Sequence, residues 1–289
     1  LLEVDSEFQA TPALAEKWDI SSDRKTYTFF LRKNVEWTDG VKLKSDDFIF
    51  AWNRLVDPKT KSEYSKYLED VQSFSATNDH TLVVKLKRIS PNFLQSLHHF
   101  ATFPQRRDLI KKYGARWWTP EHLATLGPYR LAKWEKGKKL RFERFEKYTG
   151  EKPQVTAVEA IVEPNADKAR DLVREKKIDL LFAITTADIV KYTGSGKDSW
   201  KIEQFDALNT AFLGFNTKSK LGRNINLRKA VALALDRSRI QSVLESGKVP
   251  ADALLPKTMA AYEPTALPFD LSQARRMMLD AGYKDPNLF

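Results

Sequence analysis

Hydrophobic residues change their spacing repeatedly along this chain, from the pattern of a strand to that of a helix and back. Residues 26–32 (TYTFFLR) and 80–86 (HTLVVKL) are rich in the aromatic and β-branched types that favour strands. Between them, residues 45–56 place apolar side chains at helical spacing. Strands and helices therefore mix along the chain, which predicts an α/β or α+β protein.

Further elements follow from the same two patterns. Strands are predicted at residues 129–134, 140–146, 155–162, 178–182 and 210–215. Helices are predicted at residues 91–97, in a basic segment that ends at Gly114, and at residues 167–176, 224–246 and 272–281. Ser45 is the expected N-cap of the helix at 45–56, and Asp57-Pro58 is its expected end.

Length and composition limit the class of protein. The chain has 289 residues, enough for about two domains, and its 42% hydrophobic and 30% charged residues are ordinary for a globular protein. Its longest apolar runs, such as residues 230–235, are far shorter than the roughly 20 residues of a membrane-spanning helix. The absence of cysteine excludes disulfides, thiol nucleophiles and cysteine-ligated metals. Because the chain opens on Leu1, we expect either a cleaved N-terminal segment or an excised piece.

Positive charge is concentrated in one part of the chain. The formal net charge is +10, and residues 105–152 hold 14 basic and 6 acidic residues. Trp117, Trp118, Tyr129 and Trp134 accompany them. One interpretation is a surface that attracts nucleic acid, acidic lipid or an acidic solute. The other is a solvated basic face that aids solubility, which the interleaved acidic residues favour.

No group of residues has the spacing of a catalytic or metal site. The histidines are His80, His98, His99 and His122, without the HExxH arrangement of a zinc enzyme. The segment at 194–196 (GSG) lacks the frame of a phosphate-binding loop, and no GxSxG elbow is present. Asp46-Asp47 has the position of first-turn helix residues rather than of an acid–base pair. The motifs therefore predict no enzyme activity, no metal and no cofactor.

Several short motifs occur in a particular order. They are residues 12–18 (PALAEKW), 27–33 (YTFFLRK), 36–40 (EWTDG), 45–58 (SDDFIFAWNRLVDP), 125–129 (TLGPY), 215–216 (FN), 228–237 (RKAVALALDR) and 274–283 (ARRMMLDAGY). In this order they resemble the motifs of the family 5 extracellular solute-binding proteins of ABC importers, and most closely those of the oligopeptide-binding members. The resemblance covers essentially the whole chain, whereas members are typically longer.

The resemblance implies a fold and a division into domains. The expected fold is α/β and periplasmic-binding-protein-like, with two lobes of the type II, large peptide-binding class, and it is incomplete in this chain. Residues 1–106 would form the small subdomain of lobe 1, residues 107–206 part of the main lobe 1 domain, and residues 207–289 the first part of lobe 2. The opening strand–helix unit and a long C-terminal part would lie outside the chain.

The resemblance also implies a function and a mechanism. Members hold an extended peptide between their lobes by hydrogen bonds to its main chain, and they close about a hinge before docking on a permease. Tyr64, His99 and Phe212 match residues that face the ligand. Asp206, Asn209 and Thr210 would belong to a crossover with hinge character. Because the acidic group that holds the peptide amino terminus would lie outside the chain, we expect this chain alone to bind peptide weakly or not at all.

Partners and location follow from the same resemblance. It implies a peptide or another small solute and an ABC permease as partners, no nucleic acid, and a monomer. The location would be periplasmic or extracellular, with or without a lipid anchor on a preceding segment. Dipeptides, nickel chelates, oligosaccharides and opine-like solutes remain alternatives, because one scaffold serves them all. Two other classes stay open: a nucleic-acid or anionic-surface binder that uses residues 105–152, and a hydrolase that uses paired carboxylates.

Overall fold

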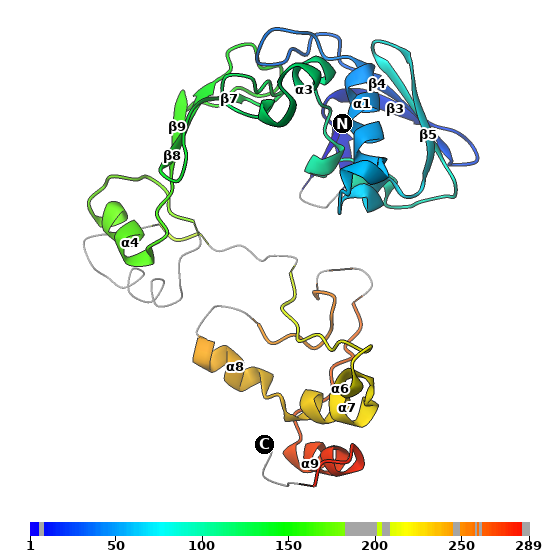
Figure 1. The fold of residues 1–289 in the computed structure, drawn as a ribbon, viewed down its shortest axis with the longest axis vertical. Coiled ribbons are helices and arrows are strands. Elements are labelled where there is room, and N and C mark those ends of the chain that lie inside the picture. Colours follow the sequence, from blue (N-terminus) through cyan, green and yellow to red (C-terminus); the bar gives the residue numbers. More distant parts are fainter. Residues whose placement is uncertain are drawn as a thin grey trace. The chain divides into compact units, whose positions relative to one another are not determined.

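The fold is seen in a computed structural model of the chain (Figure 1). The structure describes residues 1–5, 9–182, 201–203, 209–244, 249–257, 259 and 262–284. It divides into two compact units, Leu1–Pro164 and Asn165–Phe289. Within the described residues, no helix is both long and apolar enough to cross a bilayer. The expected three-part division, with boundaries after residues 106 and 206, stays a prediction.

The strands of the first unit form antiparallel sheets. They are β1 (Leu2–Val4), β2 (Ala10–Pro12), β3 (Ala15–Ile20), β4 (Thr26–Leu31), β5 (Val71–Asn78), β6 (Thr81–Leu86), β7 (Tyr129–Glu135), β8 (Lys139–Arg144) and β9 (Ala157–Ile161). Strands β1 and β2 pair with each other, a four-stranded sheet has the order β3-β4-β6-β5, and a three-stranded sheet has the order β7-β8-β9. The predicted strands that correspond to β4, β6, β7, β8 and β9 are confirmed. Strands β1, β2, β3 and β5 were not predicted.

The four-stranded sheet buries one of its faces. In β4, Tyr27, Phe29 and Leu31 are buried, and the residues between them are partly exposed, as the alternation of a strand requires. Phe29 lies opposite Leu82 of β6, which is fully buried as well. These inward-facing side chains form one core, and each contributes roughly 1.5–3 kcal/mol by leaving water.

Helix α1 (Ser45–Val56) packs into that core. Phe48 and Trp52 are fully buried, and both lie on the same side of the helix because they are four residues apart. The Trp52 ring makes an edge-to-face contact with Phe74 of β5, with 5.5 Å between ring centroids. The helix and the sheet therefore share one apolar interior.

The ends of α1 are set by polar residues. The Asp47 carboxylate accepts a hydrogen bond from the main-chain N–H of Lys44 (3.0 Å), so Lys44 is the N-cap. The Ser45 hydroxyl donates instead to a main-chain carbonyl of β5. The expectation that Ser45 caps the helix is therefore wrong by one residue. The predicted end at Asp57-Pro58 is confirmed.

Short helices fill the remaining connections of the first unit. They are η1 (Pro58–Thr60), η2 (Ser65–Leu68), α2 (Phe93–Ser96), η3 (Phe100–Thr102), α3 (Arg107–Tyr113) and η4 (Gly114–Arg116). Helices α2 and α3 confirm the helices predicted at 91–97 and before Gly114. At Gly114 the backbone turns to a positive φ of 52°, which a residue without a side chain adopts most easily.

Two of the sequence motifs form hydrogen bonds with each other in the first unit. The main-chain N–H of Thr38 donates to the carbonyl of Thr125 (2.9 Å), and the N–H of Thr125 donates to Thr38 Oγ1 (3.0 Å). Close by, the Arg106 guanidinium lies over the Trp37 ring and pairs with Asp39 at 2.7 Å. Residues of the motifs EWTDG and TLGPY therefore take part in tertiary contacts of the first unit.

The second unit is helical in the residues described. Its helices are α4 (Ala166–Arg174), α6 (Lys220–Arg223), α7 (Ile225–Ala234), α8 (Arg237–Leu244) and α9 (Leu271–Asp280). Helices α7 and α9 pack against each other, with Ala230 and Ala274 fully buried. Helices α4 and α9 confirm the helices predicted at 167–176 and 272–281.

Three other predictions for the second unit are wrong. The helix expected at 224–246 is divided in two, because the Asp236 carboxylate accepts a hydrogen bond from the main-chain N–H of Arg239 (3.0 Å) and begins a new helix. The strands expected at 178–182 and 210–215 are irregular. No described strand of this unit lies beside them, and an extended segment needs a partner to satisfy its main-chain groups as a strand.

Candidate functional site

Four rings from two segments of the first unit gather near its surface. They belong to Tyr64, Tyr67, His99 and Phe100, and we call them the ring cluster. The Tyr64 centroid lies 5.4 Å from that of His99 and 5.1 Å from that of Phe100, and His99 stacks on Tyr67 at 4.0 Å. Tyr64 is 40% exposed and Phe100 is 60% exposed. The structure thus brings together two of the residues that the sequence predicts to contact ligand, Tyr64 and His99.

Buried groups beneath the ring cluster hold it in place. His99 is the N-cap of η3, and its Nδ1 accepts a hydrogen bond from the main-chain N–H of Ala101 (3.2 Å). Fully buried Thr102 donates its hydroxyl to the carbonyl of His99 (2.8 Å), and Trp52 Nε1 donates to the carbonyl of Thr102 (2.8 Å). The position of the imidazole is therefore tied to the core helix α1.

Electrostatics favour the neutral form of His99. Burial lowers its pKa below the ordinary value of 6.5, and the charges of His98 and Lys66 lower that pKa further. Since Nδ1 accepts a hydrogen bond, the ring proton lies on Nε2, which can donate. The cluster therefore combines apolar ring faces with a neutral N–H donor and the hydroxyl of Tyr64, the kind of surface that binds a partly apolar, partly polar ligand.

A cavity of about 200 Å³ adjoins the ring cluster. Its lining residues are Ala51, Arg54, Leu55, Thr60, Ser62, Tyr64, Phe100, Ala101 and Gln105. Arg54 is half-buried there, and its Nη1 donates to Gln105 Oε1 at 2.9 Å. We take the ring cluster and this cavity together as the candidate site.

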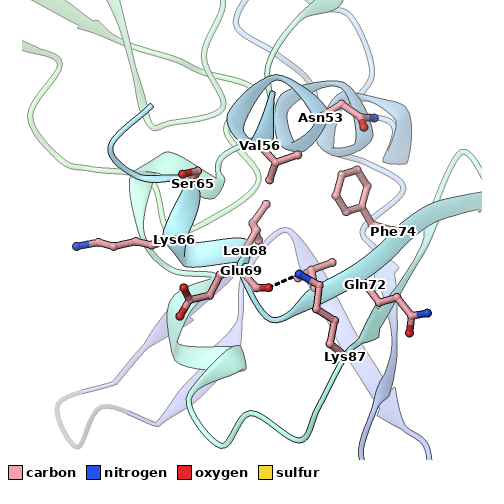
Figure 2. A pocket seen from close by; sticks show the side chains of 10 residues that line it. Asn53, Val56, Ser65, Lys66, Leu68, Glu69, Gln72, Phe74 and Lys87 are labelled. Carbon is pink, nitrogen blue, oxygen red and sulfur yellow. Dashed lines mark hydrogen bonds between the residues drawn. The ribbon is translucent and has the colours of Figure 1, made fainter. Parts of the chain in front are cut away.

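A larger cavity, of about 660 Å³, lies between the end of α1, η2 and β5 (Figure 2). Val56, Leu68 and Phe74 point into it. Lys87 Nζ donates to the main-chain carbonyl of Glu69 (2.6 Å) at its side. None of the site residues predicted from the sequence lines this cavity. This cavity is the larger of the two, but the smaller one adjoins the ring cluster with its exposed aromatic rings and hydrogen-bonding groups, so we keep the smaller one as the candidate site.

A comparison with protein families assigns the chain. Residues 9–289 match the model of the bacterial extracellular solute-binding proteins, family 5 Middle. The chain belongs to this family. It is similar to the periplasmic oligopeptide-binding protein OppA of Haemophilus influenzae, with 29% identity over 99% of this chain and 58% of OppA. It is equally similar, at 29% identity over 98% of this chain and 57% of the relative, to the probable deoxycholate-binding periplasmic protein YgiS of Escherichia coli.

A solved structure agrees with this assignment. The periplasmic oligopeptide-binding protein OppAIV from Borrelia burgdorferi matches this family 5 chain with a TM-score of 0.85 and 28% identity, over 100% of this chain and 61% of that one. The resemblance inferred from the ordered motifs is thereby confirmed, as is the expected fold class, an incomplete two-lobed α/β fold. The chain spans less than two thirds of the length of the relatives it matches.

The other predicted site residues lie in the second unit. Phe212 is 74% exposed in an irregular segment, and Asn209 and Thr210 precede it in the same segment. Asp206 lies outside the described residues. The ligand contact of Phe212 and the hinge character of the other three stay predictions.

Of the candidate site, sequence reasoning predicted only Tyr64 and His99, and Tyr67, Phe100 and Arg54 are the most informative of the residues that it missed. Tyr67 follows Tyr64 by three residues, a spacing that places two side chains on one side of a helical turn, so it could have been found. Phe100 follows His99 directly, and its exposure has no local signature. Arg54 reaches Gln105 from 51 residues away, a contact that only the tertiary fold creates.

Ion pairs engage many of the basic side chains in the segment at 105–152. More than half of its basic side chains pair with a carboxylate, namely Arg106, Arg107, Arg130, Lys133, Lys139, Arg141, Arg144 and Lys147. Glu159 of β9, for example, pairs across the sheet with Lys139 and Arg141 of β8. This arrangement favours a solvated face over a surface that binds phosphates.

Two of the histidines take part in aromatic packing. His122 stacks on Tyr113 with 3.6 Å between centroids, and His99 belongs to the ring cluster. Among the residues that the structure describes, no group of three or more His, Cys, Asp or Glu side chains could hold a metal ion. The candidate site is therefore built from rings, hydroxyls, an amide and a guanidinium.

Proposed function

We propose that this chain is part of the solute-binding component of an ABC importer that captures extended peptides. The observation that carries the proposal is the match of residues 9–289 to a solute-binding family, with proteins named as oligopeptide-binding among its similar relatives. The ring cluster supports it, because the cluster offers exposed aromatic area and hydrogen-bonding groups on one surface.

In the proposed mechanism, Tyr64 and His99 contact the peptide from one lobe and Phe212 contacts it from the other. Strands of the protein pair with the peptide main chain, so affinity depends little on the side chains of the peptide. Asp206, Asn209 and Thr210 belong to a hinge about which the lobes close, and closure excludes bulk water.

The proposal extends to partners and location. The protein is periplasmic or extracellular, free or lipid-anchored, and monomeric, and it delivers its ligand to a membrane permease without chemical change. It uses no cofactor or metal and binds no nucleic acid. The similar relatives OppA and YgiS, which are both named as periplasmic, support the location.

Saturation-transfer difference NMR tests the proposal, because it detects weak binding. We expect transfer from the 289-residue chain to mixed tri- to pentapeptides, with affinity weaker than micromolar. The variant Tyr64→Ala/His99→Ala should reduce the transfer several-fold, whereas Tyr113→Ala/His122→Ala, which removes another stacked Tyr–His pair, should leave it unchanged.

Deoxycholate serves as a competing ligand in the same experiment, since the relative YgiS is named as probably deoxycholate-binding. If transfer is seen to deoxycholate and to no peptide, the peptide proposal is wrong, and the ligand is instead an amphipathic acid. Peptide transfer that is equal in the wild-type chain and in both double variants would remove the ring cluster from the proposal.

A further inference from the structure

The lining of the cavity of about 200 Å³ beside the ring cluster carries a positive charge without a negative one. Of the residues that line it, only Arg54 is charged, and no carboxylate is among them. The other polar groups in its wall are hydroxyls and the amide of Gln105. A cavity with one cation and neutral neighbours attracts a negatively charged group.

Among the described residues, Arg54 differs from two nearby arginines, Arg106 and Arg107, in its lack of a carboxylate partner. Arg106 pairs with Asp39 and Asp108, and Arg107 pairs with Asp46. Within the described part of the chain, Arg54 has no carboxylate partner, and one N–H of its guanidinium donates to Gln105 Oε1 (2.9 Å). The guanidinium carries five N–H donors in a planar fork, so it is held in position with donors to spare.

The size of the cavity limits what enters it. Sites that enclose a whole small molecule measure about 300–1,000 Å³, so 200 Å³ suits one end group of a larger ligand. A single guanidinium matches the charge and the planar geometry of one carboxylate. A phosphate ester carries about −1.5 to −2 charges near neutral pH and would call for a second cation, which the lining does not supply.

We propose that this cavity is a carboxylate subsite, in which Arg54 binds an acidic group while an adjoining aromatic or aliphatic group of the same ligand packs on Tyr64 and Phe100. The proposal deepens the proposed function and rests on it, because it adds a preference for acidic solutes to the ring cluster. The carboxylate comes from the C-terminus of a peptide or from an acidic side chain, and both share the same chemistry.

Small probes test the subsite on the 289-residue chain. N-acetylphenylalanine and its carboxamide differ only in the acidic group, and the dipeptide N-acetyl-Asp-Phe-amide carries a side-chain carboxylate instead. Binding is followed through the Nε–H resonances of the arginines in ¹H–¹⁵N spectra. We expect each acid to bind at least about tenfold more tightly than the carboxamide and to shift the Arg54 resonance, because charge-assisted hydrogen bonds exceed neutral ones. The tighter of the two acids identifies the source of the carboxylate.

Three variants complete the experiment. Arg54→Gln should abolish the preference for acid, and Arg54→Lys, which keeps the charge but loses the fork, should retain part of it. Lys112→Gln is the control, because Lys112 lies over the Tyr113 ring and does not line the cavity, and it should retain the full preference. Circular dichroism establishes that each variant is folded.

The subsite is contradicted if acid and carboxamide bind equally, if neither binds, or if folded Arg54→Gln keeps the preference. These outcomes are separate from the proposed function. Peptides that engage Tyr64 and His99 without any preference for acid would leave peptide capture standing and remove the subsite. Probes could instead bind with a preference for the acid while the Tyr64→Ala/His99→Ala variant leaves peptide binding unchanged. That result would support the subsite and remove the ring cluster from peptide capture.

Discussion

The pKa of His99 is a direct report on the ring cluster. Burial, with help from the charges of His98 and Lys66, holds this pKa below 6.5. We expect an NMR titration of the His99 ring to show a value below 6.5, and Lys66→Gln to raise it, since one repelling charge is removed. A value above 6.5 would mean that the imidazole is not packed against the rings as described.

The sign of the linked stability change follows from the same shift. The folded-state pKa of His99 is the lower one, so the unfolded chain binds more protons between the two values. This contribution to stability is fully present above pH 6.5, begins to fall below that value, and is lost as the pH falls through the lower folded-state pKa of His99. It is small, because the imidazole is only partly buried.

The ion pairs of the buried Arg106 side chain should contribute to the stability of the first unit. Its side chain is 6% exposed, lies over Trp37, and pairs with Asp39 and Asp108 at 2.7 Å each. Arg106→Ala should destabilise the first unit by roughly 1–3 kcal/mol in urea unfolding; the two aspartates reach water, which keeps the cost below that of a fully buried pair.

The matched control for that variant is Arg88→Ala. Arg88 also pairs with an aspartate at 2.7 Å, but its side chain is 72% exposed. Its removal should cost less than about 1 kcal/mol. Equal losses in the two variants would show that burial of the Arg106 guanidinium is not what makes its ion pairs matter.

What the sequence tells about single residues depends on the range of the contact. Tyr64 and His99 were identified through the family resemblance, because a contact between residues 35 positions apart leaves no local pattern. Tyr67 could have been found from its spacing to Tyr64 within one turn. Arg54 could not, since its surroundings exist only once η3 and the residues after it pack beside α1.

At the scale of elements, prediction succeeded where one face is buried and the other is not. Strand β4 alternates strictly between buried and partly exposed residues, and α1 carries its apolar residues on one side. Edge strands lack that contrast. In β5 only Val71 is buried and Phe74 is partly buried, and β3 is mostly exposed, so neither strand shows a clear alternation of apolar and polar residues.

Predictions failed in the second unit for other reasons. The apolar period continues through residues 224–246, but one capping carboxylate, that of Asp236, ends the first helix and begins the next. The segment at 210–215 has the composition of a strand, but composition does not determine whether another strand lies beside it to form hydrogen bonds.

Substitutions of Trp52 in α1 separate the contribution of core packing from that of its hydrogen bond. Trp52→Ala removes a fully buried ring and should destabilise the first unit by about 3–5 kcal/mol. Trp52→Phe keeps most of the packing and loses the hydrogen bond to the carbonyl of Thr102, so it should cost about 1–3 kcal/mol. Urea unfolding followed by circular dichroism measures both. Equal losses would contradict a core held mainly by packing.

On the scale of the whole molecule, the ion pairs of the basic segment lead to a clear expectation. Arg130, Lys139 and Arg141 already pair with Glu143 or Glu159, so a phosphate would have to compete with a carboxylate for each of them. Fluorescence anisotropy should show no binding of a single-stranded oligonucleotide at low salt. Binding that weakens steeply with salt, with a linear log–log dependence, would instead support the nucleic-acid alternative.

The central proposal for this family 5 chain is that a bound peptide contacts Tyr64 and His99 and also contacts Phe212. Photocrosslinking tests it most directly, with pentapeptides that carry a benzoylphenylalanine at each position in turn and with mass spectrometry to locate the adducts. The account predicts adducts at the ring cluster, on the segments around Tyr64 and His99, and on the segment around Phe212. Adducts confined to residues 105–152, or spread evenly over the surface, would contradict it.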